Sequence, residues 1–191
     1  MRNGKRIVAA MAATVFATMG IATSAAAESS TRATAGAPVV KFTAAQQQVL
    51  QSEVNSHLKD YGGGKQISVN QVAYDNGAMI LTLPLPGETK ARAIGEPVTA
   101  LGVADCAFTH ACLWSDTNFN GSRLDRVICA TVVLGAPFNS STGSIHNNQT
   151  TGTQTLLLNA GGEILNGNLA PSRVNDTGVG SRSNARSWRV C

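Results

Sequence analysis

The stretch at residues 106–121 reads CAFTHACLWSDTNFNG and determines the fold that we predict for the chain. Within it, Trp114, Phe119 and Gly121 follow the spacing aromatic-x4-aromatic-x-Gly. This spacing suits a hairpin that folds over on itself, because one ring can pack on the other while glycine takes a backbone conformation that a Cβ would oppose. The stretch therefore predicts the first corner of a β-domain.

The N-terminus predicts export. Three basic residues precede an apolar, uncharged segment at residues 7–21, and three alanines follow at residues 25–27. Positive, apolar and small-residue regions in this order form a secretory signal peptide, which we expect at residues 1–27. The apolar segment is short for a transmembrane helix, so we expect a secreted, extracellular protein with no membrane contact after cleavage.

The charge balance excludes a nucleic-acid partner. Without residues 1–27 the chain keeps 12 of its 15 basic residues and all 11 acidic ones, which leaves a formal net charge of +1. A near-neutral chain without clusters of Lys and Arg lacks the basic surface that nucleic-acid binding needs. Only 14% of all residues are charged and 5% are aromatic, which suits a turn-rich exported β-protein.

The cysteines mark a folding unit at residues 104–191. Cys106, Cys112, Cys129 and Cys191 all lie after residue 105. An even number of cysteines in an exported chain predicts disulfides, although four cysteines allow three pairings and the sequence leaves all three open. Short apolar segments separated by Gly, Asn, Ser and Thr favour a sandwich or barrel, with a mainly β fold. We expect strands at residues 111–114, 122–133, 155–158, 164–165 and 187–191, and loops at 139–153 and 173–186.

Residues 43–87 predict a helix packed on a β-hairpin. Thr43 and Gln46 fit a capping box at the start of the helix. Apolar residues then recur every three or four positions and indicate one buried stripe. The stripe consists of Leu50, Val54, Leu58 and Tyr61, and Val49 broadens it.

The hairpin follows the helix. Its first strand changes phase at Asn70, which suggests a bulge, and residues 75–77, DNG, predict the tight turn before a strand at residues 78–83. Residues 28–42 are rich in small polar residues and predict a flexible mature N-terminus. Residues 88–103 have mixed charge with Gly and Pro and predict a linker.

The corner at Trp114, Phe119 and Gly121 resembles the first Greek-key motif of βγ-crystallins. With its cysteines, CAFTHACLWSDTNFNGSRL (residues 106–124) resembles the opening of crystallin-like domains in small secreted actinobacterial proteins. These proteins are grouped with the streptomycete metalloproteinase inhibitor, in the SMPI-like peptidase-inhibitor family. GGGKQISVNQVAYDNGAMILTLPLPG (residues 62–87) resembles the extension that many of them carry.

The resemblance implies a fold, a pairing and an activity. The implied fold is a pair of Greek-key motifs that form one wedge-like sandwich over residues 104–191, behind the helix-plus-hairpin extension. The implied pairing joins Cys106 to Cys112 in a short local loop, and it would leave Cys129 to pair with Cys191. A zinc site at Cys106, His110 and Cys112 is the other use of these residues, but the exported context favours disulfides.

The chain departs from the crystallin pattern in two places. Residues 155–167 contain no aromatic residue, so the second corner is degenerate. Calcium-binding crystallins carry two loops of the form Asn/Asp-Asn/Asp-x-x-Ser/Thr-Ser, and the fragments of that pattern here are Asn139, Ser144, Asn175 and Asp176. Calcium needs about six to eight oxygens including carboxylates, and these loops offer one carboxylate. We therefore expect no cofactor, with weak calcium binding at these four residues as the alternative.

The sequence predicts no catalytic residue. It contains no Gly-x-Ser-x-Gly elbow and no His-Glu-x-x-His motif, and its histidines are His57, His110 and His146. His57 lies near the end of the predicted helix, where an imidazolium suits the helix dipole. Asp116 and Asp125 flank the corner, and we expect them to be solvated turn residues.

The leading expectation is a secreted, monomeric, non-enzymatic protein. The resemblance implies that it inhibits a secreted protease, in particular a metalloprotease, with a rigid exposed loop. One alternative is a binding or structural module of the cell envelope with weak calcium affinity. Another is an exported toxin or antimicrobial protein in which residues 28–103 are a removable pro-region.

Overall fold

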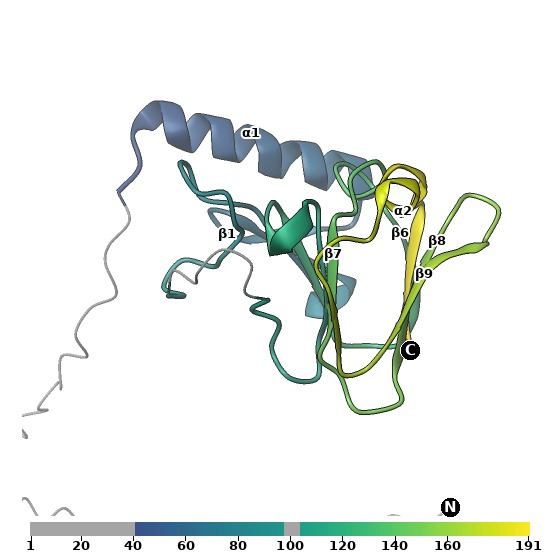
Figure 1. Ribbon diagram of the computed structural model, residues 1–191. Coiled ribbons are helices and arrows are strands. Elements are labelled where there is room, and N and C mark those ends of the chain that lie inside the picture. The colour runs from purple at the N-terminus through teal and green to yellow at the C-terminus, as the bar shows by residue number, and fades with distance from the viewer. Residues whose placement is uncertain (1–40, 98–103) are drawn as a thin grey trace, which may run out of the picture. The chain divides into compact units, whose positions relative to one another are not determined.

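The structure is a computed structural model that describes residues 41–97 and 104–191 (Figure 1). Within these residues it is mainly β, with eleven strands in two antiparallel sheets, as the sequence predicts. The predicted signal peptide and most of the predicted flexible segment lie outside the described residues. So do residues 98–103 of the predicted linker.

Helix α1 (Ala44–Tyr61) has the predicted capping box. The Thr43 hydroxyl accepts a hydrogen bond from the N–H of Gln46 at 3.2 Å, and the Gln46 side chain accepts one from the N–H of Thr43 at 2.9 Å. Leu50 and Val54 are buried as predicted. Val49, by contrast, is 60% exposed, so its assignment to the buried stripe was wrong.

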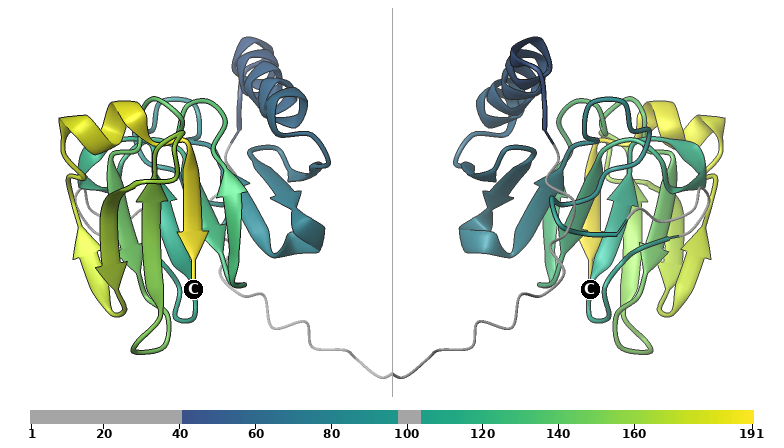
Figure 2. Two further views of the ribbon diagram at one scale, coloured as in Figure 1. Left: turned by 90° about the vertical axis from the view of Figure 1, so that its right-hand side faces the viewer. Right: turned by 90° about the vertical axis from the view of Figure 1, so that its left-hand side faces the viewer.

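The larger sheet has the strand order β1-β2-β3-β5-β4-β7-β10 and the smaller sheet the order β6-β11-β8-β9. Figure 2 shows α1 and the strands that follow it, in blue, at one end of the unit and the C-terminal strands, in yellow and green, at the other. The strands are β1 (Lys65–Ser68), β2 (Gln71–Tyr74), β3 (Met79–Thr82), β4 (Ala111–Trp114), β5 (Arg123–Arg126), β6 (Ala130–Val133), β7 (Ser144–Asn147), β8 (Gln154–Leu158), β9 (Ile164–Leu169), β10 (Ser172–Val174) and β11 (Ser187–Val190).

From β4 onward the strands form two halves of four, β4–β7 and β8–β11. In each half the third strand crosses to the other sheet: β6 pairs with β11, and β10 pairs with β7. The two halves therefore share both sheets. Side chains from the two sheets meet in one core, to which the larger sheet contributes Leu113, Leu124 and Ile145 and the smaller Leu157 and Trp188.

The helix-plus-hairpin segment belongs to the same core. Strand β3 pairs with β5, with Leu81 opposite Leu124, so the larger sheet continues from the segment into the sandwich. Leu50 and Val54 of α1 pack in the same buried cluster as Trp188. Asn70 itself lies in a turn between β1 and β2, and the irregularity in their pairing falls earlier than predicted, between Gln66 and Ser68.

That turn is fixed by a buried side chain. Asn70 has no exposed surface, and its side-chain amide donates to the carbonyl oxygens of Leu83 at 2.7 Å and Arg92 at 2.8 Å. A buried amide with its hydrogen bonds made holds the two strands and the following segment together. Asn70 interrupts the alternation of apolar residues because the fold needs its side-chain hydrogen bonds at this turn.

Residues 88–97, the first part of the predicted linker, contact the corner. The N–H of Ala91 donates to the carbonyl of Gly121 at 3.0 Å, and the N–H of Gly121 donates to the carbonyl of Thr89 at 2.7 Å. Glu88 and Arg92 form an ion pair of 2.6 Å. These contacts bring the segment after β3 against the loop between β4 and β5.

Three elements lie where the sequence predicted loops: β7, β10 and helix α2 (Val179–Asn184). All four residues of β7 are buried although three of them are polar. The side-chain amide of Asn147 donates to the carbonyls of Thr153 and Asn168, at 3.0 and 3.1 Å. Because satisfied polar groups can be buried at little cost, a strand of this composition escapes detection by apolar periodicity.

Candidate functional site

The corner between β4 and β5 is held by packing and by hydrogen bonds. The rings of Trp114 and Phe119 lie 5.1 Å apart in an edge-on arrangement. Ser144 of β7 accepts a hydrogen bond from the N–H of Phe119 at 2.9 Å and donates to the carbonyl of Asp116 at 2.7 Å. Gly121 has φ of 76°, and a Cβ there would lie 2.0 Å from the Ser115 hydroxyl oxygen. The corner therefore requires glycine at this position.

Two disulfides join Cys106 to Cys112 and Cys129 to Cys191. This is the pairing that the family resemblance implied, and disulfides are typical of oxidising compartments. The zinc interpretation was wrong, because both sulfur atoms that it needs are bonded to each other. Among the residues that the structure describes, the one group with metal-ligand spacing is Cys106, Cys112 and Asp125, which contains these same two sulfurs.

Residues 106–112, here called the disulfide loop, present an aromatic side chain to solvent. Phe108 is 69% exposed, whereas Cys106 and Cys112 are buried. The N–H of Thr109 donates to the carbonyl of Asn148 at 2.9 Å, and the Asn148 side chain donates to the carbonyl of Cys106 at the same distance. The loop backbone is therefore anchored at Cys106 and at Thr109, while the side chain of Phe108 stays exposed and can make contacts.

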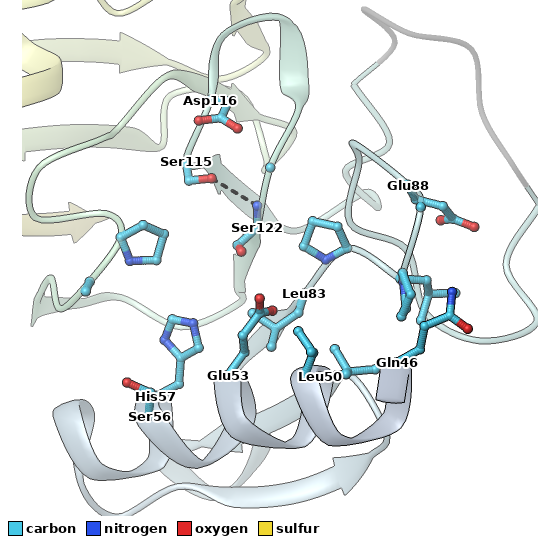
Figure 3. A pocket seen from close by; sticks show the side chains of 18 of the residues that line it. Gln46, Leu50, Glu53, Ser56, His57, Leu83, Glu88, Ser115, Asp116 and Ser122 are labelled. Carbon is cyan, nitrogen blue, oxygen red and sulfur yellow. Dashed lines mark hydrogen bonds between the residues drawn. The ribbon is translucent and has the colours of Figure 1, made fainter. Parts of the chain in front are cut away.

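A groove of about 790 Å³ runs between α1 and the loops that follow β3, β4 and β6 (Figure 3). Its floor is apolar and includes Leu50, Leu83 and Leu85, all buried. Four carboxylates line its walls. They are Glu53 and Asp60 of α1, Glu88 after β3, and Asp116 of the corner.

The remaining titratable group of the groove is His57. It is 8% exposed, and burial lowers the pKa of its imidazole against the smaller raising effects of Asp60 and the Ala136 carbonyl. Desolvation therefore opposes the imidazolium that the end of the helix dipole would favour at this position. The Nδ1 atom of His57 has no hydrogen-bond partner among the described residues.

Of the four calcium candidates, Asp176 alone has a carboxylate, and both Asp176 and Ser144 are engaged in other contacts. Ser144 is used by the corner, as described above. The carboxylate of Asp176 accepts a hydrogen bond from the N–H of Gly178 at 2.8 Å and pairs with Arg182 at 3.2 Å. The loops that contain Asn139 and Asn175 meet through Thr177, whose N–H donates to the carbonyl of Gly143. The arrangement does not fit a cation that needs several free carboxylate oxygens.

The other acidic residue beside the corner lies inside the fold. Asp125 is a buried residue of β5 that pairs with Arg123 at 2.8 Å, so its prediction as a solvated turn residue was wrong. Burial raises the pKa of Asp125 despite the nearby guanidinium. Arg123 also pairs with Asp105, which in turn contacts Lys90. Sequence reasoning missed this ion cluster because Lys90 and Asp105 lie far from Arg123 in the chain and reach it only in the folded protein.

The two other histidines lie near the disulfide loop. His146 is a buried residue of β7 and stands opposite Cys112 in the sheet. Its Nε2 accepts a hydrogen bond from Arg173 at 3.3 Å. Burial, with Arg173 adding to the effect, lowers the pKa of His146 to about 4. His110 lies within the loop, and its backbone N–H donates to the carbonyl of Ala107.

The chain matches no protein-family model, no curated protein and no solved structure. The family resemblance therefore depends on the residues quoted above and on the strand order. No helix within residues 41–97 and 104–191 is long and apolar enough to cross a membrane.

Proposed function

We propose that this protein is a secreted peptidase inhibitor, built on a crystallin-like Greek-key domain, that blocks a metalloprotease with its disulfide loop. The strand path supports the crystallin-like assignment, because the third strand of each half, β6 or β10, pairs with a strand of the other half. The corner at Trp114, Phe119 and Gly121 supports it in the first half. The two disulfides and the N-terminal sequence support export.

The exposure of Phe108 carries the proposal. Its side chain is 69% exposed at the tip of a loop whose two ends are covalently joined and buried. An exposed aromatic side chain has an energetic reason to bind into an apolar pocket. A loop that is already ordered loses little further conformational entropy on binding, which is what a tight inhibitor needs.

The disulfide would also resist the protease itself. A peptide bond hydrolysed between residues 107 and 111 would leave both new ends attached to the same scaffold. The Asn148 side chain and backbone would continue to hold Cys106 and Thr109. The cut loop would therefore remain in the protease cleft rather than dissociate as a product.

The helix-plus-hairpin segment supports an inhibitor that keeps its extension over an exported toxin with a removable pro-region. Removing residues 28–103 would take α1 and β1–β3 out of the shared core and expose the edge of β5. An unpaired strand edge and an uncovered apolar core favour aggregation. The intact mass of the exported protein distinguishes the two cases, since an extension that is kept gives a chain beginning near residue 28.

The test is inhibition by the purified mature protein. We expect stoichiometric inhibition of thermolysin-like metalloproteases in a titration against active-site-calibrated enzyme. Phe108→Ala is expected to weaken inhibition about a hundredfold, because truncating a central apolar anchor costs roughly 2–3 kcal/mol. The matched control is Val179→Ala, which truncates an apolar side chain of similar exposure, 76%, on α2. No inhibition of metallo-, serine or cysteine proteases would refute the proposal.

A further inference from the structure

The groove beside α1 combines an apolar floor with charge of one sign. Figure 3 shows Leu50, Glu53 and His57 extending from α1 toward the loop that carries Ser115 and Asp116. The floor contains buried leucines, and Val49, 60% exposed, stands at its mouth. The apolar surface that stays open in the groove comes from Val49 and from the half-buried Pro84, Pro86 and Pro137. It can accept an apolar side chain, because burying apolar surface on both partners is favourable.

Three of the four carboxylates are not neutralised. Glu88 is paired with Arg92 at 2.6 Å. Glu53, Asp60 and Asp116 have no cationic partner within 4.0 Å among the described residues, and no Lys or Arg lines the groove. The unpaired charges lie on both walls, since Asp116 belongs to the corner and the other two to α1. The groove is therefore complementary to a positively charged ligand.

His57 adds an unpartnered polar atom to the wall of the groove. Its imidazole is more than nine-tenths buried and lines the groove, yet its Nδ1 atom has no hydrogen-bond partner among the described residues. A buried polar atom without a partner costs free energy, so such atoms in native proteins call for an explanation. Because this atom itself has almost no exposed surface, a ligand could bond to it only if the groove wall moved slightly.

The length of the groove suggests what kind of ligand fits. Its α1 wall runs from Ala45 to Asp60, which is about 22 Å at the rise of an α-helix. About six or seven residues of extended peptide cover that length. A peptide can also alternate cationic and apolar side chains, as the walls and floor require, whereas a metal ion would leave the leucine floor unused.

We infer that this groove binds an extended basic segment of another protein. Lysine or arginine side chains would lie between Glu53 and Asp116, and an apolar side chain would contact Val49 and Pro84. The inference is independent of protease inhibition, because none of residues 107–109 lines the groove.

The probe is a fluorescent seven-residue peptide that alternates lysine and leucine, with binding measured by fluorescence anisotropy on the mature protein. We expect saturable binding that weakens as salt is added, since the charged pairs are partly exposed. A peptide that alternates glutamate and leucine tests the charge requirement. One that alternates lysine and glycine tests the requirement for apolar side chains. Equal binding of either control peptide would overturn the inference. So would no binding of the probe when the protein is raised to about millimolar concentration.

Variants locate the binding. Glu53→Gln combined with Asp116→Asn is expected to weaken binding about tenfold, because two exposed ion pairs are worth about 0.5–1 kcal/mol each. Val49→Lys places a like charge at the mouth of the groove and is expected to weaken it at least as much. The control is Glu163→Gln, an exposed acidic residue outside the groove. Phe108→Ala should leave peptide binding unchanged, so a failure here and a failure of the inhibitor proposal are distinguishable. Unchanged binding in both groove variants would contradict the inference.

Discussion

The two halves of the sandwich follow the same strand path but turn their first hairpins differently. Between β4 and β5 the chain folds over on itself, with Trp114 against Phe119 and a hydrogen bond from Phe119 to Ser144 of β7. Between β8 and β9 the chain makes a local turn, in which the Asn159 side chain accepts hydrogen bonds from the N–H groups of Gly161 and Glu163. One topology is thus compatible with a long-range corner and with a self-contained turn.

The difference shows where the stability of the fold is concentrated. The first hairpin is tied to β7 and to the segment before the disulfide loop, and its aromatic side chains are buried. The turn of the second hairpin satisfies itself, and Ile164 and Leu169 of β9 are each 61% exposed. Changes in the first hairpin should therefore destabilise the whole protein, whereas changes in the turn and exposed positions of the second should remain local.

The largest effect is expected from Trp114→Ala. The side chain is fully buried and packs on Phe119, so its loss should cost about 3–5 kcal/mol of unfolding free energy. Ile164→Ala, which truncates an exposed apolar residue of the second hairpin, should cost less than about 1 kcal/mol. Denaturant unfolding with the disulfides intact measures both. Similar values for the two variants would show that the halves contribute equally.

The disulfides should follow next, in an order set by the loops they close. The sequence separations are 62 for Cys129–Cys191 and 6 for Cys106–Cys112. On the chain-entropy estimate, replacing both cysteines of the first bond by serine costs about 4 kcal/mol and of the second about 2 kcal/mol. Thermal unfolding of the two double variants checks this order. If the short loop costs more, packing of the buried Cys112 outweighs loop entropy.

Two glycines provide a matched pair, one in each hairpin. Gly121 and Gly162 have φ of 76° and 82°, but only at Gly121 would a Cβ meet neighbouring atoms, among them Ser115 at 2.0 Å. Gly121→Ala should cost about 2–3 kcal/mol, since the steric clash adds to the cost of a left-handed backbone. Gly162→Ala should cost about 1 kcal/mol, from the backbone alone. Equal losses in chemical denaturation would mean that the corner adjusts around the new methyl group.

The smallest effect concerns pH and the fourth strand of each half. His146 of β7 is buried, whereas Arg189, its counterpart in β11, is exposed. The pKa of His146 is lowered to about 4 in the folded protein, from an ordinary value of about 6.5. The unfolded chain therefore binds the proton first as the pH falls. The contribution of His146 to folding stability is therefore complete above about pH 6.5 and is lost toward pH 4.

Between pH 7 and pH 5 this loss amounts to about 2 kcal/mol. His146→Gln can keep an acceptor for Arg173 but cannot titrate, so its stability should fall less over the same range. Urea unfolding at pH 7, 6 and 5 compares the two proteins. Parallel pH profiles would show that other groups cause the acid sensitivity. His57, whose pKa is also lowered, contributes in the same direction and remains in the variant.

Local patterns explain what was predictable from the sequence. The capping box at Thr43, the turn at residues 75–77 and the spacing from Trp114 to Gly121 each depend on residues close in the chain. Each of these elements forms where the sequence places it. By contrast, β7 contains one apolar residue in four and is buried because distant groups satisfy its polar side chains. No local pattern carries that information.

The candidate sites show the same division. The cysteines and the exposed Phe108 lie in one short segment that the sequence already singled out. The groove, however, joins Glu53 to Asp116 across more than sixty residues of chain, and it exists because β3 pairs with β5. The burial of His57 likewise involves the backbone of Ala136, far along the chain, so it was not evident from its place in the helix.

The exchanged strands set an order for biosynthesis. Within the part of the chain that the structure describes, β6 has β11 as its one neighbour in the smaller sheet, and β11 also separates β6 from β8. A ribosome must therefore add more than fifty residues after β6 before that strand can be paired. Until then the smaller sheet cannot close, and Cys129 has no nearby partner. A chain translocated through a narrow channel would cross while it is still unfolded, and it would close its second sheet only on the far side.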